Sequence, residues 1–301
     1  MTRQTEISIM ASSVRGAKYD EAAKENLQRP ELIAPILKAV VPEYRNYTCE
    51  DIISFIVKDS ICESPVDDVS TVANMMPTEQ SSISEKLIRY DTRFKVINPR
   101  LSDKSISVYL HIDLEVQNDY QPTNPSYPIV KRGIYYGARE ISSQLGILTE
   151  TTNYDDIEKV YSIWICNENI PDELKNTVSS YRITKTDEVG VTDEKDSDYD
   201  LLHVIIIRRG NNYGNEEIFD YLTSFFNSDI DGICRHVDIR NNEEVMKGVK
   251  KMSGLGQSIY QEGVIETLIN LVKKGMLTIA NAAKEAQMSE EAFSELLKKS
   301  N

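Results

Sequence analysis

Cysteine is scarce in this sequence, with four residues among 301. Cys49, Cys62, Cys166 and Cys234 stand far apart and form no C-x-x-C pair. Neither a zinc cage nor a disulfide framework is therefore expected, and the thiols should be reduced and mostly buried. The three histidines also lack a second histidine at metal-ligand spacing, so they form no zinc motif.

Long apolar runs are absent as well. The opening residues, MTRQTEISIM, contain no apolar segment followed by a cleavage site. No later segment approaches the ~20 apolar residues that a helix needs to cross a bilayer. We therefore expect a cytoplasmic protein that does not contact a membrane.

Basic residues are fewer than acidic residues. The chain has 34 lysines and arginines against 48 acids, which gives a formal net charge of −14. This balance argues against indiscriminate nucleic-acid binding by the whole surface. The window from Lys86 to Glu140 is an exception, because its nine basic and six acidic residues leave a surplus of three positive charges. If a polyanion binds this chain, we expect it to bind there.

The remaining composition is that of an ordinary globular protein, with 40% apolar and 27% charged residues. A helix is predicted after Pro30, a residue that suits a helix start, because apolar residues recur at helical spacing from Ile33 to Val40. A second, short helix is predicted over Asp51–Val57. The first part of the chain should therefore be helical.

Five segments between about Arg89 and Arg208 are rich in β-branched and aromatic residues and are bounded by turn formers. They read YDTRFKVI, ISVYLHIDLEVQ, VYSIWIC, SYRITK and LLHVIIIRR. A helix is predicted between the second and third, over Tyr127–Leu145, with an apolar stripe that includes Ile134 and Ala138. Because a helix between two strands implies a crossover, the predicted fold class is α/β, a mixed β-sheet flanked by helices.

The chain beyond about Cys234 is predicted to be helical. We expect a main domain over residues 18–232 and a helical C-terminal extension over residues 233–301. The segment MLTIANAAKEAQMSEEAFSELLKK fits two short helices with Ser289 capping the second, which is the outline of a helix-turn-helix. A helical tail or dimerisation segment is the simpler interpretation, so the sequence also leaves a homodimer open.

The segment Ile106–Gln117 alternates completely between two kinds of residue. Its even positions are all apolar, while its odd positions are polar or amphipathic. One face of this strand must therefore be core. The other face carries Asp113 and Glu115, although acidic residues are disfavoured in strands. We therefore expect these two acids to have a role other than strand formation.

The preceding strand, Arg89–Val96, alternates too and places Asp91 and Arg93 on one face. One register of an antiparallel hairpin sets Asp91 opposite Glu115 and Arg93 opposite Asp113. The second pair would be an ion pair, whereas the first brings like charges together and is destabilising unless a cation lies between them. A divalent cation such as Mg²⁺ or Mn²⁺ suits two such carboxylates and would assist phosphodiester hydrolysis. A solvated sheet face is the alternative, and it is common.

Three motifs together, YDTRF, HIDLEVQ and YPIVKRGIYYGAREISSQL, resemble the recombination-promoting nuclease and transposase-like group (Rpn) of the PD-(D/E)XK nuclease superfamily. The likeness also includes YDEAAKENLQRPELIAPILKAVVPEY and YDDIEKVYSIWIC, and it covers roughly Lys18 to Arg208. It implies a PD-(D/E)XK-like core and the activity of a Mg²⁺-dependent DNA endonuclease.

By this resemblance Asp91 and Glu115 are metal ligands and, together with Gln117, the catalytic residues. The superfamily carries a lysine where this chain has Gln117, although the Rpn group is similar in carrying glutamine there. Glutamine provides neither a positive charge nor a proton, but it can orient the attacking water. Lys95 or Lys131 could supply the missing charge.

Further roles are predicted around the hairpin. Residues expected to contact the DNA backbone are Lys95, Lys131, Arg132 and Arg139. A solvated helix face, with the neighbouring tyrosines packed on the sheet, is the equally simple alternative. Glu43 is the predicted acid of the first helical region, with Glu85 as its competitor. His111 shares the face of the acids, and a histidine on the strand surface is a simpler interpretation than a general base.

Two other functions stay open at this point. A catalytically degenerate nuclease fold that binds DNA or a protein without cutting fits the absent lysine and the acidic net charge. A structural or oligomerising protein, in which the hairpin acids pair with Arg93 and its neighbours, fits the same alternation. Neither of these would need a metal ion at the hairpin.

Overall fold

A computed structural model describes residues 21–61, 91–102, 107, 109–122, 125–145, 151–210, 216–286 and 288–299. The described chain forms two compact units. An α/β unit lies within residues 27–225 and 231–239. A helical unit contains residues 240–301 together with 21–26 and 226–230, among those described.

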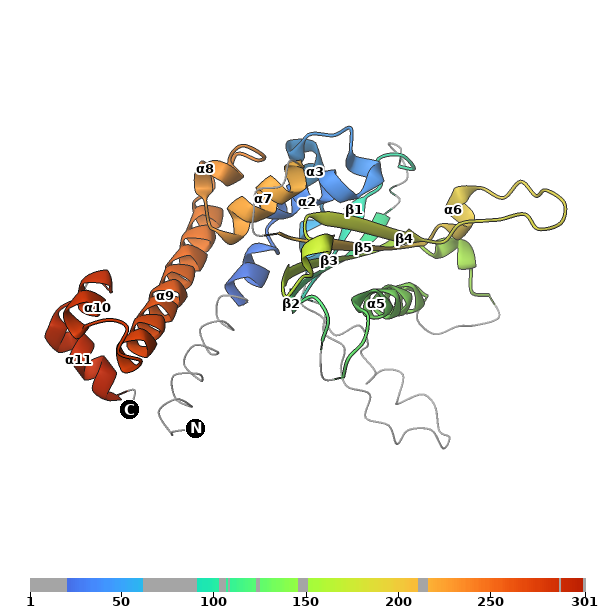
Figure 1. Cartoon of the computed structure of the whole chain (residues 1–301). Helices are drawn as coiled ribbons and strands as arrows, with labels where there is room; N and C mark the ends of the chain where they lie inside the picture. Colours follow the sequence, from blue (N-terminus) through green and yellow to red (C-terminus); the bar gives the residue numbers. More distant parts are fainter. Residues whose placement is uncertain are drawn as a thin grey trace, which may run out of the picture. The chain divides into compact units, whose positions relative to one another are not determined.

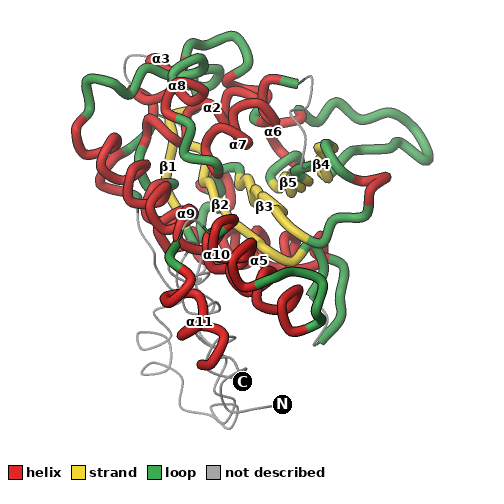
Figure 2. The backbone as a smooth tube through the Cα atoms, turned by 60° about the vertical axis from the view of Figure 1, so that its left-hand side comes forward, coloured by secondary structure: helices red, strands yellow, loops and turns green. Residues whose placement is uncertain are grey.

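The α/β unit is built on a mixed sheet with five described strands in the order β1-β2-β3-β5-β4. β1 (Thr92–Ile97) and β2 (Tyr109–Asp119) form an antiparallel hairpin. β3 (Val160–Glu168) and β5 (Leu202–Arg208) continue the sheet parallel to β2, and β4 (Thr177–Arg182) pairs antiparallel with β5. Figure 2 traces these strands in yellow. They arise from the five segments rich in β-branched and aromatic residues that predicted them.

Helices cover both faces of this sheet. α2 (Pro30–Val40), α3 (Cys49–Phe55) and α7 (Glu217–Phe226) lie on one side, and α5 (Ile129–Gln144) lies on the other (Figure 1). α2 begins at Pro30 as predicted, because the first turn of a helix does not need the N–H that proline lacks. The predicted α/β fold with a mixed sheet flanked by helices is therefore confirmed.

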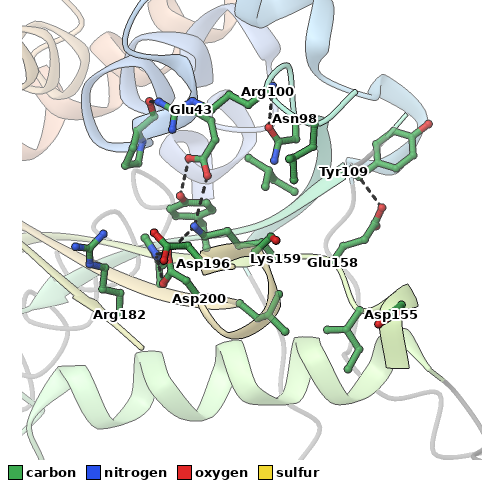
Figure 3. Close-up of a pocket in the computed structure, with 18 of the residues that line it drawn as sticks. Glu43, Asn98, Arg100, Tyr109, Asp155, Glu158, Lys159, Arg182, Asp196 and Asp200 are labelled. Carbon is green, nitrogen blue, oxygen red and sulfur yellow. Dashed lines mark hydrogen bonds and ion pairs between the residues drawn. The ribbon is translucent and has the colours of Figure 1, made fainter. Parts of the chain in front are cut away.

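Short elements connect the strands and helices. They are η1 (Pro42–Tyr44), η2 (Lys58–Ser60), η3 (Tyr154–Asp156), η4 (Asp172–Leu174), α6 (Asp196–Tyr199) and α8 (Ile230–Ile233). η3 precedes β3 and α6 precedes β5, so both lie near the amino ends of parallel strands. Residues of both elements line a pocket of the α/β unit (Figure 3).

α5 packs on the sheet through a face other than the predicted one. Its buried residues are Ile129, Gly133, Tyr136, Gly137 and Glu140. Ile134 and Ala138, predicted to face the core, are exposed. A Cβ at Gly133 would lie 2.5 Å from Val204 Cγ1 and 2.9 Å from Trp164 Nε1, so glycine is needed for this close approach. The close approach of α5 to the sheet determines which face of the helix is buried. The prediction had used apolarity alone.

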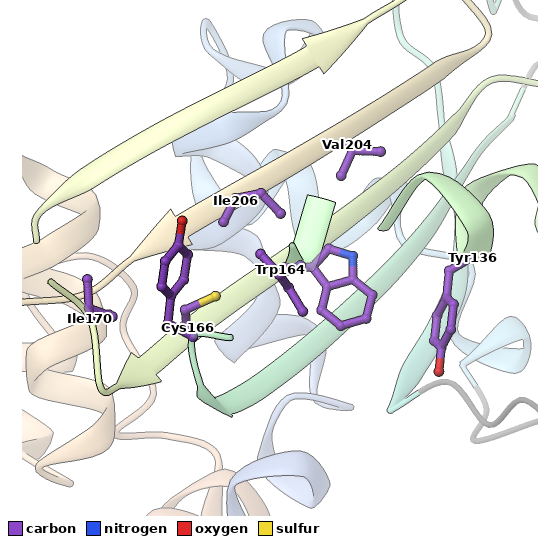
Figure 4. Packing of buried hydrophobic residues seen from close by; sticks show 8 residues of the cluster. Tyr136, Trp164, Cys166, Ile170, Val204 and Ile206 are labelled. Carbon is purple, nitrogen blue, oxygen red and sulfur yellow. The ribbon is translucent and has the colours of Figure 1, made fainter. Parts of the chain in front are cut away.

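The core between α5 and the sheet centres on Trp164 (Figure 4). Its ring meets the Tyr136 ring edge-to-face, with centroids 5.3 Å apart, and Ile206 belongs to the same cluster. Cys166 is also buried there, and burial raises the pKa of its thiol to about 12. The three described cysteines are free thiols, as predicted, and Cys62 lies outside the described residues.

The helical unit has a small core of its own. It contains α9 (Glu243–Lys273), α10 (Ile279–Glu285) and α11 (Glu290–Lys299). Ser289 Oγ accepts a hydrogen bond from Ala292 N at 3.2 Å, which confirms the predicted cap of the last helix. None of the described helices combines the length and the apolar composition needed to cross a bilayer. The buried core residues are Leu268, Ile269, Ala282, Ala283 and Phe293.

Candidate functional site

The β1–β2 hairpin has the register that brings the predicted acids together. Thr92 at the start of β1 pairs with Leu114 of β2. Asp91 directly precedes Thr92, and Glu115 directly follows Leu114, so the two acids face each other across the hairpin. The register considered from the alternation of the sequence is confirmed.

Reciprocal hydrogen bonds hold the Asp91 and Glu115 carboxylates in place. The Asp91 backbone N–H donates to Glu115 Oε1 at 2.8 Å, and the Val116 N–H donates to Asp91 Oδ2 at 3.0 Å. Each carboxylate thus reaches the backbone of the other strand, so both lie at one spot on the hairpin. Glu115 is only 4% exposed. Two negative charges at one spot, one of them buried and the other half-buried, favour a cation beside them.

Arg132 brings positive charge to this spot from α5. Trp164 is the neighbour of Glu115 across the β2–β3 pair. The Arg132 guanidinium carbon lies 5.1 Å from the Trp164 ring centroid and 5.0 Å from that of Tyr136, and its Nη2 donates to Tyr136 Oη at 2.8 Å. Burial opposes the charge of this group, but the bond to Tyr136 and the negative charge of Glu115 raise the pKa of Arg132. Arg132 therefore lies within electrostatic reach of Glu115.

A buried ion network joins α5 to the hairpin on the same face. Arg93 pairs with Asp113 in the backbone register, but its Nε lies 2.8 Å from Glu140 Oε2 of α5. His111 Nδ1 lies 2.7 Å from Glu140 Oε1, and His111 Nε2 lies 2.9 Å from Glu158 Oε2. The side chain of Asp113 lies outside the described part of the structure. Arg93 thus binds a helix acid, and the predicted ion pair between Arg93 and Asp113 stays a prediction.

His111 is a buried member of this network, so its predicted place on the strand surface is wrong. The residue is 4% exposed. An ionised carboxylate only accepts hydrogen bonds, so both ring nitrogens must donate and the ring carries a positive charge. Burial alone would lower the pKa of His111, but its bonds to Glu140 and Glu158 raise it above the ordinary value. A ring held in this way does not serve as a general base.

The predicted phosphate contacts differ in their access to solvent. Lys131 is exposed on α5, and Arg139 is half-buried on the same helix. The Lys95 side chain is 44% exposed, and its Nζ lies 3.9 Å from Glu158 Oε2. An exposed lysine can contact a phosphate group directly. A half-buried arginine is accessible to a phosphate group only on its exposed side.

Glu43, the predicted helix acid, lies on the opposite face of the sheet. Its Oε2 accepts a hydrogen bond from Tyr161 Oη at 2.6 Å. Side chains alternate along a strand, so Tyr161 points away from the face on which Trp164 neighbours Glu115. The prediction for Glu43 is therefore wrong, because η1 buries this residue against Tyr161. Glu85, its competitor, lies outside the described residues.

The donor set of the hairpin fits a hard cation. Asp91 and Glu115 each present a carboxylate, and oxygen is the ligand that Mg²⁺ prefers. Across the described residues, no group of three or more histidine, cysteine or acidic side chains is placed to hold a metal ion. The side chain of Gln117 lies outside the part of the chain that the structure describes. The two hairpin acids are therefore the ligands from which a metal site can be argued.

Glu140 was not predicted as a site residue, although the positions of two glycines in the sequence indicate that it faces the sheet. Gly133 and Gly137 are four residues apart and mark the face of α5 that can approach a sheet closely. Glu140 follows Gly137 by three residues and so shares that face. No local sequence pattern indicates Glu158. It precedes β3 and contacts His111 only because the fold brings the two residues together.

Comparisons with protein-family models, with curated proteins and with solved structures find no match. The likeness to the Rpn group therefore stays a prediction that depends on the motifs of the sequence. Within the described residues, the hairpin and α5 carry the candidate chemistry.

Proposed function

We propose that this chain is a divalent-metal-dependent DNA endonuclease with a PD-(D/E)XK-like core. The observation that carries the proposal is the pair of reciprocal hydrogen bonds that hold Asp91 and Glu115 at one point of an antiparallel hairpin. These carboxylates would hold Mg²⁺ or Mn²⁺ through their oxygens. The bound ion would polarise a phosphoryl oxygen and lower the pKa of a bound water.

Two further residues complete the proposed mechanism. Gln117, two positions after Glu115 in β2, would orient the attacking water through its side-chain amide. Arg132 would provide the positive charge that a lysine provides in the superfamily, and would stabilise the charge that develops on the phosphate. The negative charge of Glu115 acts on Arg132, which supports this role.

DNA is the proposed substrate because basic residues lie on the same face of the sheet as the two acids. Lys95 lies on β1, and Lys131, Arg132 and Arg139 lie on α5, the helix that covers the same face of the sheet. Such side chains neutralise phosphates without reading the base sequence. The acidic remainder of the chain, with a net charge of −14 overall, would confine DNA to this face.

Plasmid cleavage tests the proposal. The purified chain, incubated with supercoiled plasmid and Mg²⁺ or Mn²⁺, should nick or linearise the DNA, and a chelator should stop the reaction. Asp91→Asn and Glu115→Gln each replace a negative ligand with a neutral side chain of the same shape, so both should lose cleavage. The exposed residue Glu173 in η4 supplies the control Glu173→Gln, which should cut as the wild type does.

Equal traces of nicking by the wild type and both hairpin variants would point to a contaminating nuclease. In that case the proposed enzyme activity fails. Circular dichroism of each variant establishes that a loss of cleavage does not come from unfolding.

One observation favours a second candidate, a degenerate nuclease fold that binds DNA or a protein without cutting. Arg132 lies within electrostatic reach of Glu115 and could neutralise it in place of a metal ion. Fluorescence anisotropy with labelled DNA separates the candidates. The degenerate fold predicts binding that is unchanged by chelator and no cleavage with any divalent ion. The endonuclease predicts binding and cleavage that both depend on the ion.

A further inference from the structure

Glu140 is a buried acid that the proposed mechanism does not use. It lies near the carboxyl end of α5 and has no exposed surface. Its carboxylate contacts both strands of the hairpin. Arg93 Nε of β1 lies 2.8 Å from Oε2, and His111 Nδ1 of β2 lies 2.7 Å from Oε1. The Glu140 carboxylate therefore ties α5 to β1 and to β2.

Arg132 lies near the other end of α5, on the same stripe of the helix. Arg132, Tyr136 and Glu140 follow one another at intervals of four residues, so their side chains lie one above the other. Tyr136 and Glu140 are buried and Arg132 is half-buried, so this stripe faces the sheet. Arg132 lies over the ring of Trp164, and the charge of Glu115 acts on it. The stripe thus has a charged group at each end, and each interacts with the sheet.

The spacing of these two charged groups matches the spacing of their partners on β2. The eight residues from Arg132 to Glu140 span about 12 Å of helix, at about 1.5 Å per residue. The four residues from His111 to Glu115 span about 13 Å of strand, at about 3.3 Å per residue. Because α5 connects two parallel strands, it runs back along β2 in the opposite direction. Arg132 therefore reaches Glu115 when Glu140 is bound to His111.

The contacts of Glu140 resist a shift of α5 along its own axis. The hydrophobic effect is non-directional, so apolar packing resists separation of the helix from the sheet more than it resists sliding. A buried carboxylate between two cations is different, because sliding would leave it without compensation for its charge. Glu140 is thus the residue best suited to define the position of α5 along β2.

We propose that Glu140 is a positioning residue for Arg132. Its contacts with Arg93 and His111 set the place of α5 along β2 and thereby hold the Arg132 guanidinium near Glu115. The catalytic consequence of this placement rests on the proposed function. A displacement of about 1 Å can cost about 100-fold in rate, so a group that stabilises developing charge on a phosphate depends on such positioning.

The fluorescence of Trp164 tests the placement of Arg132 without DNA or metal. Trp164 is the single tryptophan of the chain, and its ring centroid lies 5.1 Å from the Arg132 guanidinium carbon. Arg132→Met removes the charge beside the ring and should shift the Trp164 emission in the wild-type background. The same substitution should give a much smaller shift in the Glu140→Gln background, because the guanidinium no longer lies over the ring. A merely structural role of Glu140 predicts equal shifts in both backgrounds.

His111→Gln supplies a second background, because Glu140→Gln is expected to weaken the fold. It removes the positive charge from one of the two contacts of Glu140 and leaves Arg93 in place. The shift caused by Arg132→Met should be reduced in this background too. Glu173→Gln changes an exposed acid in η4, so the full shift should remain. Circular dichroism establishes that each background is folded.

Cleavage kinetics test the catalytic consequence. At saturating plasmid, Glu140→Gln should lower the rate by about 10- to 100-fold. Arg132→Met should have little further effect in that background, because the two substitutions remove the same interaction and residues that act as a unit are not additive. Two independent residues would instead give losses that multiply.

Several results overturn the proposal. Arg132→Met shifts the emission fully in the folded Glu140→Gln and His111→Gln backgrounds, or it gives no shift in the wild type, or Glu173→Gln reduces the shift as strongly. Multiplying losses of cleavage also contradict it. If the shift depends on Glu140 and the wild type does not cut DNA, the proposed nuclease activity fails, whereas the placement of Arg132 by Glu140 is supported.

Discussion

Asp91 and Glu115 are oriented by the backbone of the hairpin. A backbone N–H is a fixed donor, so it holds each carboxylate in place before any ligand binds. The alternation of the sequence predicts that both residues share a face. It does not predict the reciprocal bonds, because these depend on the bend at Asp91, one residue outside β1. The candidate pair was thus predictable from sequence, whereas its preorganisation was not.

His111 and His203 are two buried histidines that should titrate in opposite directions. We expect the pKa of His111 to lie above the ordinary value of about 6.5, because two carboxylates bind its ring, and the pKa of His203 to lie below it. His111 then adds stability that is complete below about pH 6.5 and is lost as the pH rises through its folded pKa. His203 has the opposite sign, so its contribution is complete above about pH 6.5 and is lost as the pH falls from there through its lower folded pKa. NMR titration of the imidazole protons measures both values.

Glu140→Gln supplies the control for this titration. It removes one carboxylate from His111 and should lower the pKa of that ring while leaving His203 unchanged. It should also destabilise the fold by about 3–5 kcal/mol in urea unfolding, because it breaks a buried ion pair. A wild-type His111 pKa below that of His203 would contradict the charge assigned to this network.

Among the elements, the strands followed from composition and the buried face of α5 did not. β-branched and aromatic residues suit a half-buried pleated surface, so the strand segments were recognisable without tertiary information. The buried face of α5 depends on Gly133 and Gly137, which are selected by closeness to Val204 and Trp164. Likewise, Arg93 binds Glu140, a partner that α5 brings from 47 residues away. Contacts made by the fold are not visible in local sequence patterns.

Gly133→Ala should destabilise the protein even though alanine favours helices. The helix preference alone would stabilise α5 by about 1 kcal/mol. The new Cβ would meet Val204 and Trp164 too closely, and overpacking of this kind costs about 1–3 kcal/mol. We therefore expect a net loss of stability in urea unfolding. Ser142→Ala, on the exposed side of α5, should be neutral or slightly stabilising, and a stabilising Gly133→Ala would contradict the packing described here.

On the scale of the whole molecule, the chain combines an α/β unit with a helical unit. The hairpin acids, α5 and the pocket all belong to the α/β unit. The helical unit has its own core around Phe293, so its stability can be changed separately. The proposed nuclease chemistry therefore depends on the α/β unit.

Phe293→Ala tests this division of the chain. Phe293 is fully buried, and its truncation should destabilise the helical unit by about 3–5 kcal/mol. The α/β unit should keep its own unfolding transition, followed by the fluorescence of Trp164. Met276→Ala is the control, because Met276 is 72% exposed and should change neither transition. A single transition shifted as a whole by Phe293→Ala would argue against independent units.

Binding of Mn²⁺ tests the proposed metal site most directly. Electron paramagnetic resonance counts free Mn²⁺ during a titration and does not depend on DNA or on turnover. We expect a saturable site in the wild type and in Glu173→Gln, and its loss in Asp91→Asn and in Glu115→Gln. Equal Mn²⁺ binding by all four proteins, or no binding by the wild type, would contradict a metal site at the hairpin.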